Sequence, residues 1–327
     1  MVTIADVAKL AGVSKATASR AFSRPEIVSP DTALRVHSAA EKLGFVANNA
    51  ARLLAGGRSG ILALVVPTLD NSYFAPIIAG AQSRADAAGY QLTVVVHPLE
   101  SAAEIPSFER LRRQVDGLIV IAPRGSDDFI ESALGSTPTV LVDREIEGTP
   151  SVIADSAAAF GRLVQGLAEA GHQRIVYIGG PAGSWQDGQR TRAVQDAAAS
   201  AGVRLAVVGP HASTFAAGIE ASDAVRAEDP SAVVPYATAL GLGVQFAYLS
   251  AGDQPPLVSS ERAIVQALGH DDVPAIDADG QQLGSTAAEM LLTRISTPDA
   301  PPERKRLDVE LELGGLRDLT GSDIGTR

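Results

Sequence analysis

Short apolar runs alternate with longer segments of helical periodicity from Gly60 onward, and this alternation constrains the fold more than any other feature of the chain. Apolar runs of strand length occur at residues 61–66, 92–96, 115–121, 140–142 and 174–178. Helical segments are expected at residues 74–88, 157–170 and 189–201. Strands that alternate with helices form parallel sheets with right-handed crossovers. The sequence therefore predicts an α/β body.

Length and composition limit the class of protein. The chain has 327 residues and no cysteine, so disulfides and thiolate metal sites are excluded, and a cytoplasmic location is expected. The amino terminus has no basic n-region, and Asp6 and Lys9 interrupt any apolar core, so we expect no signal peptide. The uncharged residues 231–252 include Pro235 and several glycines, and they predict a buried strand and helix rather than a membrane span.

Charge is distributed unevenly along the chain. Residues 1–59 hold eight basic and four acidic side chains, whereas residues 60–327 hold 19 basic and 34 acidic ones. The net charge of −11 therefore hides a basic amino-terminal segment on an acidic body. Such asymmetry favours a nucleic-acid partner for the basic segment.

The basic segment has the pattern of a helix-turn-helix. Apolar residues at helical spacing stop at Gly12, which suits a helix end, and Ser14 is suited to cap the next helix. Two short helices joined by a turn of about three residues that contains glycine are typical of this motif. A third helix is predicted from Pro30, with Ser29 as its cap and Gly44 at its end.

A run of matched positions resembles the DNA-binding headpiece of the lactose-repressor family. It comprises Asp-Val-Ala-x-x-Ala-Gly-Val-Ser-x-x-Thr-x-Ser-Arg at Asp6 to Arg20, then Val28-Ser29-Pro30-x-Thr32, Leu43-Gly44-Phe45-Val46-Ala47-Asn48 and Ala51-Arg52-Leu53-Leu54-Ala55-Gly56. The resemblance implies a sequence-specific transcriptional regulator, a repressor that binds a near-palindromic operator as a homodimer. It is not expected to be an enzyme.

The predicted DNA contacts begin with the second helix. Its first residues, Lys15 and Ala16, and Arg20 one turn later are expected at base edges in the major groove, where Lys and Arg favour guanine. Short hydroxyl side chains suit phosphates, which position a protein without specifying sequence. The full predicted set is Thr3, Ser14, Lys15, Ala16, Thr17, Ser19, Arg20, Ser29, Asn48, Ala51 and Leu54.

Three segments are expected: a headpiece at residues 1–47, a hinge helix and linker at 48–59, and an effector-binding and dimerisation domain at 60–327. The hinge helix is too short to be stable alone. The resemblance implies that it orders on operator DNA and inserts Leu54 into the minor groove, where a leucine wedge unstacks base steps.

The body resembles the periplasmic-binding-protein-like core of the same family, and the resemblance implies two lobes with an effector, expected to be a carbohydrate, between them. Ligands bind beyond the carboxyl ends of parallel strands. The predicted effector contacts are Asn71, Tyr73, Phe74, Arg124, Trp185, Arg190, Tyr236 and Glu261. By the resemblance, Arg190 contacts effector hydroxyls; Trp185 either stacks on a sugar ring or packs in a core or interface.

Two stretches depart from the family pattern. Ala237-Thr238 replaces the usual Asn-Asp, and Ser259-Ser260-Glu261-Arg262 replaces a stretch that carries paired aspartates. Glu261 can still accept hydrogen bonds from hydroxyls in place of aspartate. A regulator of the same fold with a non-sugar effector, or with none, is therefore the alternative.

Other classes of protein lack their motifs here. There is no phosphate-binding loop, dinucleotide fingerprint or nucleophile elbow, and the five histidines have no metal-ligand spacing, so no cofactor or metal is expected. An enzyme on a doubly wound core would need a catalytic constellation, and none is found. A solute-binding protein would need a signal peptide and no basic segment, and both conditions fail.

Overall fold

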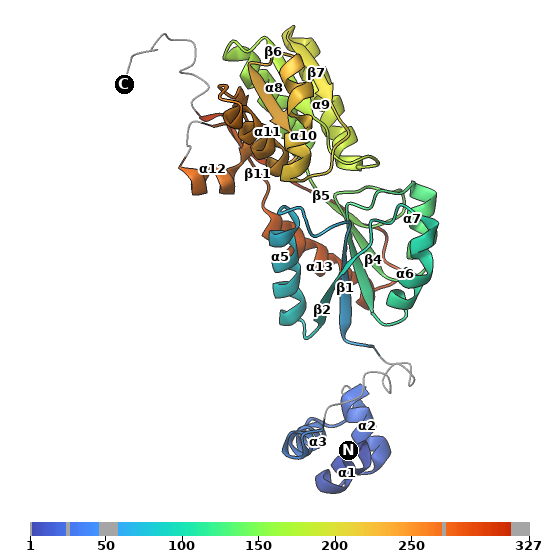
Figure 1. Ribbon diagram of the computed structural model, residues 1–327. Helices are drawn as coiled ribbons and strands as arrows, with labels where there is room; N and C mark the ends of the chain where they lie inside the picture. The colour runs from blue at the N-terminus through green and yellow to red at the C-terminus, as the bar shows by residue number, and fades with distance from the viewer. Residues whose placement is uncertain (1, 24–26, 46–57, 270–272, 315–327) are drawn as a thin grey trace. The chain divides into compact units, whose positions relative to one another are not determined.

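The computed structural model describes residues 2–23, 27–45, 58–269 and 273–314 (Figure 1). The chain divides into two compact units. The first comprises Met1–Ile61 with Arg113–Asp116, and the second comprises Leu62–Arg112 with Gly117–Arg327.

The first unit contains three short helices, α1 (Ile4–Ala11), α2 (Lys15–Ser23) and α3 (Pro30–Leu43). Their shared core is made largely of small side chains, which let the helices approach closely: Val7, Ala8, Ala11, Ala18, Ala21, Val36, Ala39 and Ala40 are buried in it. Gly12 and Gly44 end α1 and α3 in the left-handed conformation, at φ of 66° and 62°. The predicted helix-turn-helix and third helix are therefore confirmed.

The second unit begins with a lobe built on a six-stranded sheet of order β12-β5-β4-β3-β1-β2. The strands are β1 (Ile61–Val66), β2 (Gln91–Val96), β3 (Gly117–Ile121), β4 (Thr139–Val142), β5 (Ser151–Ala154) and β12 (Arg304–Leu307). The recorded pairings from β1 through β3, β4 and β5 to β12 are parallel. This is the sheet type that the alternation predicts.

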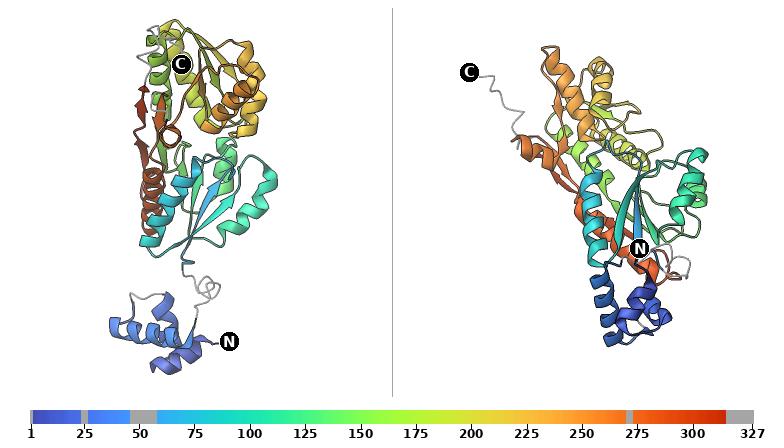
Figure 2. Two further views of the ribbon diagram at one scale, coloured as in Figure 1. Left: turned by 60° about the vertical axis from the view of Figure 1, so that its left-hand side comes forward. Right: turned by 60° about the horizontal axis from the view of Figure 1, so that its bottom comes forward.

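Helices cover both faces of this sheet (Figure 1). They are α5 (Phe74–Ala87) and α13 (Gly280–Ser296) on one face, and α6 (Ile105–Arg112) and α7 (Asp127–Leu134) on the other. Helix α13 packs along α5, and the two lie side by side in both views of Figure 2. The backbones of the two helices approach closely at Gly284, where an added Cβ would overlap the carbonyl oxygen of Ile77. The carboxyl-terminal part of the chain thus completes the first lobe.

The second lobe is built on a four-stranded sheet of order β7-β6-β8-β9. The strands are β6 (Arg174–Ile178), β7 (Arg204–Val208), β8 (Ala232–Pro235) and β9 (Leu257–Val258), and the helices are α8 (Ser156–Glu169), α9 (Trp185–Ala201), α10 (Phe215–Ala227) and α11 (Thr238–Ser250). Alternate residues of β6 enter two different cores: Ile175 and Tyr177 pack with α8 and α9, while Val176 and Ile178 pack with α10 and α11.

A small three-stranded sheet adjoins the two lobes. It consists of β10 (Ser260–Glu261), β11 (Ala275–Asp277) and β13 (Glu310–Glu312), and α12 (Arg262–Leu268) follows β10. The first lobe also contains a short 3₁₀ helix, η2 (Ala102–Glu104). Ile276 packs against the cores of both lobes. The chain passes between the lobes at residues 154–156, 277–280 and 307–310, so each lobe contains segments that are distant in sequence.

Two sequence expectations about the second unit have clear outcomes. Residues 231–252 contain the strand β8 and the helix α11, as predicted, and no helix within the described residues is long and apolar enough to cross a membrane. The helix expected at 189–201 begins earlier, at Trp185, because Ser184 caps it by accepting a hydrogen bond from the Asp187 N–H. Trp185 and Gln186 therefore lie on α9, ahead of the predicted start of the helix.

Candidate functional site

The first candidate site is the outer face of α2. Ala18 and Ala21 are buried against α1 and α3, so the opposite face of α2 points outward. On that face Lys15, Ala16 and Arg20 are exposed. Two cations and a methyl group on one side of a short helix provide what base edges in a major groove can bind.

The predicted phosphate contacts take part in capping. The Ser14 oxygen accepts the Thr17 N–H at 3.0 Å and lies 2.8 Å from the Thr17 hydroxyl. The Thr3 hydroxyl donates to Asp6 at 2.7 Å, and this bond holds the pKa of the exposed Asp6 carboxyl below its ordinary value. The Ser29 oxygen caps α3 by accepting the Thr32 N–H. These side chains order the amino-terminal ends of α1, α2 and α3.

The remaining predicted DNA contacts are placed as follows. Ser19 is exposed on α2, beside Arg20. Asn48, Ala51 and Leu54, with the predicted hinge helix, lie outside the described residues. Their roles stay predictions.

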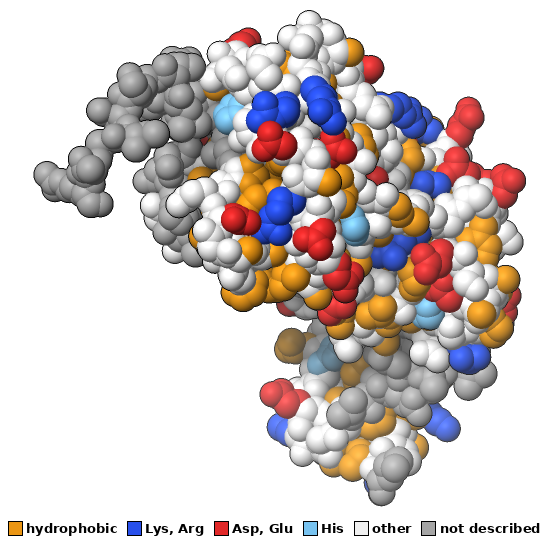
Figure 3. All heavy atoms as spheres, turned by 45° about the horizontal axis from the view of Figure 1, so that its top comes forward, with side chains coloured by type: hydrophobic (Ala, Val, Ile, Leu, Met, Phe, Trp, Pro, Cys, Tyr) orange, Lys and Arg blue, Asp and Glu red, His pale blue; other side chains and the backbone are white. Residues whose placement is uncertain are grey.

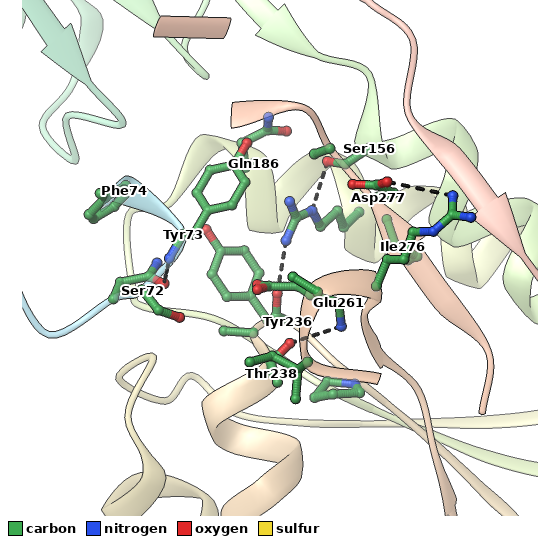
Figure 4. Close-up of a pocket in the computed structure, with 18 of the residues that line it drawn as sticks. Ser72, Tyr73, Phe74, Ser156, Gln186, Tyr236, Thr238, Glu261, Ile276 and Asp277 are labelled. Carbon is green, nitrogen blue, oxygen red and sulfur yellow. Dashed lines mark hydrogen bonds and ion pairs between the residues drawn. The ribbon is translucent and has the colours of Figure 1, made fainter. Parts of the chain in front are cut away.

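The second candidate site is a cavity of about 270 Å³ between the lobes of the second unit (Figure 4). Six of the eight predicted effector contacts line it: Asn71, Tyr73, Phe74, Arg190, Tyr236 and Glu261. They come from the loop after β1 and the start of α5, from α9, from the residue after β8 and from β10. Loops at the carboxyl ends of parallel strands therefore converge here, as the fold class leads one to expect.

Arg190 is buried, with 9 % of its surface exposed, and two hydrogen bonds within the second lobe hold it in place. Its Nε donates to the Ser156 hydroxyl at 2.9 Å, and its Nη1 donates to the Tyr236 carbonyl at 2.9 Å. The guanidinium lies 4.6 Å from the ring centroid of Phe160 and 4.8 Å from that of Tyr236. Two aromatic faces thus stabilise a cation that water does not reach freely.

Asp143, which sequence reasoning missed, is the most connected acid in the cavity. It follows β4 at a φ of 55° and accepts hydrogen bonds from the Tyr73 hydroxyl at 2.9 Å and the Ala154 N–H at 3.0 Å. The Gln186 amide, also missed, donates to it at 2.8 Å. Burial raises the pKa of the Asp143 carboxyl, while these hydrogen bonds oppose the rise.

Glu261 replaces one of the absent family aspartates, and it meets the other altered stretch. Its N–H donates to the Thr238 hydroxyl at 3.0 Å, so the two departures from the family pattern are in contact. Burial raises the pKa of the Glu261 carboxyl, against the opposing effects of Arg190 and Thr238. A desolvated carboxyl group at this position can accept or share hydrogen bonds with a ligand hydroxyl.

Two predicted contacts lie outside this cavity. Arg124 lines a neighbouring cavity, where its Nη1 is 3.8 Å from the Glu100 carboxylate. Trp185 is half-buried at the first position of α9 and lines neither cavity. Within the described residues no cluster of His, Cys, Asp or Glu could hold a metal ion.

The surface of the second unit differs in charge pattern from a basic DNA-binding face. On the face in Figure 3, acidic and basic side chains are interspersed. Ion pairs such as Arg306 with Glu145, at 2.8 Å, bring opposite charges together in this unit. The basic excess of the chain therefore stays with residues 1–59.

A helix-turn-helix unit and a two-lobed α/β unit with an internal cavity, in one chain, define a class of DNA-binding transcriptional regulators. Residues 3–48 match the family described as "Bacterial regulatory proteins, lacI family". Residues 59–311 match the family described as "Periplasmic binding proteins and sugar binding domain of LacI family". The chain belongs to the LacI family of bacterial regulatory proteins and is a DNA-binding transcriptional regulator.

Curated relatives and solved structures agree with this assignment. The chain is 29 % identical to the maltose regulon regulatory protein MalI of Escherichia coli (strain K12), over 90 % of this chain and 93 % of that protein. It is 33 % identical to the ribose operon repressor of Bacillus subtilis (strain 168), over 56 % of each. These relatives are transcriptional regulators.

Similarity of fold extends over nearly the whole chain. The structure of the lac repressor dimer bound to operator and the anti-inducer ONPF matches with a TM-score of 0.80 at 23 % identity, over 97 % of this chain and 99 % of that one. A complex of the transcriptional regulator CelR with cellobiose matches with a TM-score of 0.70 at 24 % identity, over 96 % and 99 %. The predicted headpiece and two-lobed core are thus confirmed as a fold.

Proposed function

We propose that this protein represses transcription in the cytoplasm by binding a near-palindromic operator as a homodimer, and that a carbohydrate effector in the cavity changes its operator affinity. The observation that carries the effector part is the cavity itself. Its wall combines aromatic rings with a buried guanidinium, the buried Asp143 carboxyl and the half-buried Glu261 carboxyl. Apolar walls with a few placed polar groups are typical of small-molecule sites.

The polar groups of the cavity suit hydroxyl recognition. Arg190 uses its Nε–H and one Nη1–H within the protein, so in the described part of the chain the second Nη1–H and the two Nη2–H donors are left for a ligand. Glu261 supplies acceptor oxygens, and Tyr236 and Phe160 supply apolar faces for the ring of a sugar. A hydroxyl that matches a buried polar group gives strong selectivity, because its absence leaves that group unpaired at a cost of about 1–3 kcal/mol.

The relatives support a sugar as the class of effector. The names of two relatives refer to maltose and to ribose, and one structure of the same fold holds cellobiose. The altered stretches at Thr238 and Glu261 still form one connected polar wall. We infer that they change which sugar is selected rather than removing the site.

Exposed apolar side chains support a homodimer. On α10 and α11, Phe215 and Phe246 are 43 % and 53 % exposed with ring centroids 5.5 Å apart, and Leu249 is 63 % exposed. Large apolar side chains gathered on a surface mark protein–protein contacts. A second copy would cover them, together with the outer face of α5, and two-fold symmetry would then match a palindromic operator.

The division of labour along the chain is part of the same proposal. Residues 1–47 read the operator, residues 48–59 form the hinge, and residues 60–327 bind the effector and the second copy. A change in lobe arrangement on effector binding would alter the hinge spacing in the dimer. A coupling of about 1–3 kcal/mol, which corresponds to a change of about 5–150-fold, is typical of allostery.

Operator titrations with and without saccharides test this proposal. A saccharide panel is screened by fluorescence anisotropy on operator DNA with the wild-type protein, Arg190→Ala and the matched control Arg192→Ala, an exposed arginine of the same helix. We expect one saccharide to change the operator affinity of the wild type and of the control, but not of Arg190→Ala. An operator affinity that no saccharide alters would contradict the effector part of the proposal.

A further inference from the structure

A second cavity of about 300 Å³ lies beside the first. The two share four wall residues, Asn71, Phe74, Ala122 and Tyr236, so they adjoin each other. Small-molecule sites usually have about 300–1,000 Å³. The first cavity alone is at the low end of that range, and the pair together falls well within it.

Tyr236 is a fixed partition between the cavities. Its hydroxyl lies 3.1 Å from the Ser184 hydroxyl, and its ring lies over the Arg190 guanidinium. The ring also packs against Gly180, where an added Cβ would be 2.6 Å from ring carbons. These three contacts fix the orientation of the Tyr236 ring, which therefore forms a constant wall for a ligand in either cavity.

The second cavity offers several hydrogen-bonding groups among proline, alanine and aromatic side chains, a mixture that suits another sugar unit. Hydroxyl groups from Thr68, Ser184, Ser213 and Thr214 line it, with the Asn71 amide and the carboxylates of Asp70 and Glu100. No leucine, isoleucine, valine or methionine is among the described residues that line it. Hydroxyl, amide and carboxylate groups beside an aromatic ring fit a ligand that carries a hydroxyl on nearly every carbon.

The charges of the two cavities favour a neutral ligand. Together they hold five carboxyl groups, those of Asp70, Glu100, Asp143, Glu261 and Asp277, against three guanidinium groups. Each guanidinium is already engaged: Arg124 by Glu100, Arg262 by Asp277 and Glu310, and Arg190 by Ser156 and Tyr236. Among the described residues Arg190 is held by neutral groups alone, so its remaining N–H groups can bind a ligand hydroxyl, while a phosphate or carboxylate on the ligand would also meet the excess of carboxyl groups.

We propose that the effector is a neutral disaccharide, with one ring in the first cavity, the second ring in the neighbouring cavity and Tyr236 between them. This inference rests on the proposed function, because it names the chemical class of that effector. Arg124, which lies outside the first cavity, then contacts the second sugar. The prediction that Arg124 contacts the effector therefore agrees with its position in the second cavity.

Calorimetric titration of the full-length protein tests the size and charge of the ligand. The probes are neutral disaccharides (cellobiose, maltose, trehalose and lactose), the monosaccharides glucose and galactose, and the 6-phosphates of the disaccharides. We expect at least one neutral disaccharide to bind ten or more times more tightly than its component monosaccharides and than its 6-phosphate. Equal affinity for monosaccharide and disaccharide, tighter binding of the phosphate, or no binding of any disaccharide would overturn the proposal.

Two variants locate the second sugar. Ala212 is exposed and lines only the second cavity, so Ala212→Trp fills it, and Ala199→Trp on the exposed face of α9 is the matched control. We expect Ala212→Trp to reduce the ratio of disaccharide to monosaccharide affinity to about one, and Glu100→Ala to reduce it severalfold. The control should keep the wild-type ratio. A ratio unchanged in both cavity variants would overturn the placement.

Operator binding measured on the same protein separates the two proposals. A protein that binds operator but no disaccharide contradicts the inference of a disaccharide ligand alone. A protein that binds a disaccharide with the expected ratios but without any effect on operator affinity supports this inference and contradicts the proposed regulation.

Discussion

The side-chain amide of Gln186 donates a hydrogen bond of 2.8 Å to the carboxylate of Asp143, and so joins helix α9 of the second lobe to the end of strand β4 in the first. Both side chains are buried. The same amide nitrogen lies 3.3 Å from the Ala154 carbonyl oxygen, at the first crossing between the lobes. This contact therefore stabilises one arrangement of the lobes.

Removing the amide should destabilise the second unit. In Gln186→Ala the buried Asp143 carboxyl loses a donor, and an unsatisfied buried group costs about 1–3 kcal/mol. We expect a decrease of that size in the free energy of unfolding in urea. Gln195→Ala, on the exposed face of the same helix, is the control and should change it little. Equal effects of the two variants would show that the amide contributes nothing specific.

Asp143 should make stability depend on pH in a particular direction. Burial raises its pKa in the folded protein, so the folded state binds the proton more tightly than the unfolded state does. The cost of burying the charge is present at neutral pH and declines as the pH falls through the folded pKa toward the unfolded one. Wild type should therefore gain stability relative to Asp143→Asn between pH 7.5 and 4.5. A difference that is constant, or that changes in the opposite direction, would contradict the raised pKa.

The close contact of α5 and α13 predicts the effect of a single methyl group. In Gly284→Ala the new Cβ overlaps the Ile77 carbonyl oxygen, and overpacking of this kind costs about 1–3 kcal/mol. Gly188 is the matched control, because it is also helical and no atom lies within 4 Å of an added Cβ. Gly188→Ala should stabilise by about 0.5–1 kcal/mol. Thermal unfolding of wild type and both variants measures the change in stability. A Gly284→Ala protein as stable as wild type would refute the close packing.

Much of this fold is determined by local sequence pattern. The bounds of α3, β1 and β6 agree with the predicted ones because caps and apolar runs mark them clearly. The start of α9 differs because Ser184, not a later residue, caps the helix. For these elements, the apolar run and the capping residues beside it determine where the helix or strand begins and ends.

The cavity residues that follow strand ends can be predicted from the sequence. The contacts that form only where the two lobes meet cannot. Tyr73, Tyr236 and Glu261 could be identified because loops at the carboxyl ends of strands converge. Asp143 follows a predicted strand and could have been found by the same rule. Its pairing with Gln186 could not, because the two residues are 43 apart and meet only through the arrangement of the lobes.

Leu54 is predicted to act on DNA shape. A leucine wedge unstacks base steps at a cost of a few kcal/mol and permits extra contacts on the bent duplex. Leu54→Ala should therefore reduce operator affinity and operator bending together, without changing effector affinity. Fluorescence energy transfer across the bound operator measures the bend, with Leu53→Ala as the matched control. An unaltered bend in Leu54→Ala would exclude the wedge.

The central claim is that α2 reads the operator sequence, and binding-site selection with wild type, Arg20→Ala and Thr17→Ala tests it most directly. Arg20 is exposed on the outer face of α2, and loss of a bidentate base contact costs about 1–3 kcal/mol at one base pair of each half-site. Thr17→Ala should weaken binding to all sequences about equally, because phosphate contacts carry no base information. We predict that the Arg20→Ala protein selects sites with relaxed preference at one symmetric pair of positions. A selected sequence identical to that of wild type would contradict the assignment of α2 as the recognition helix.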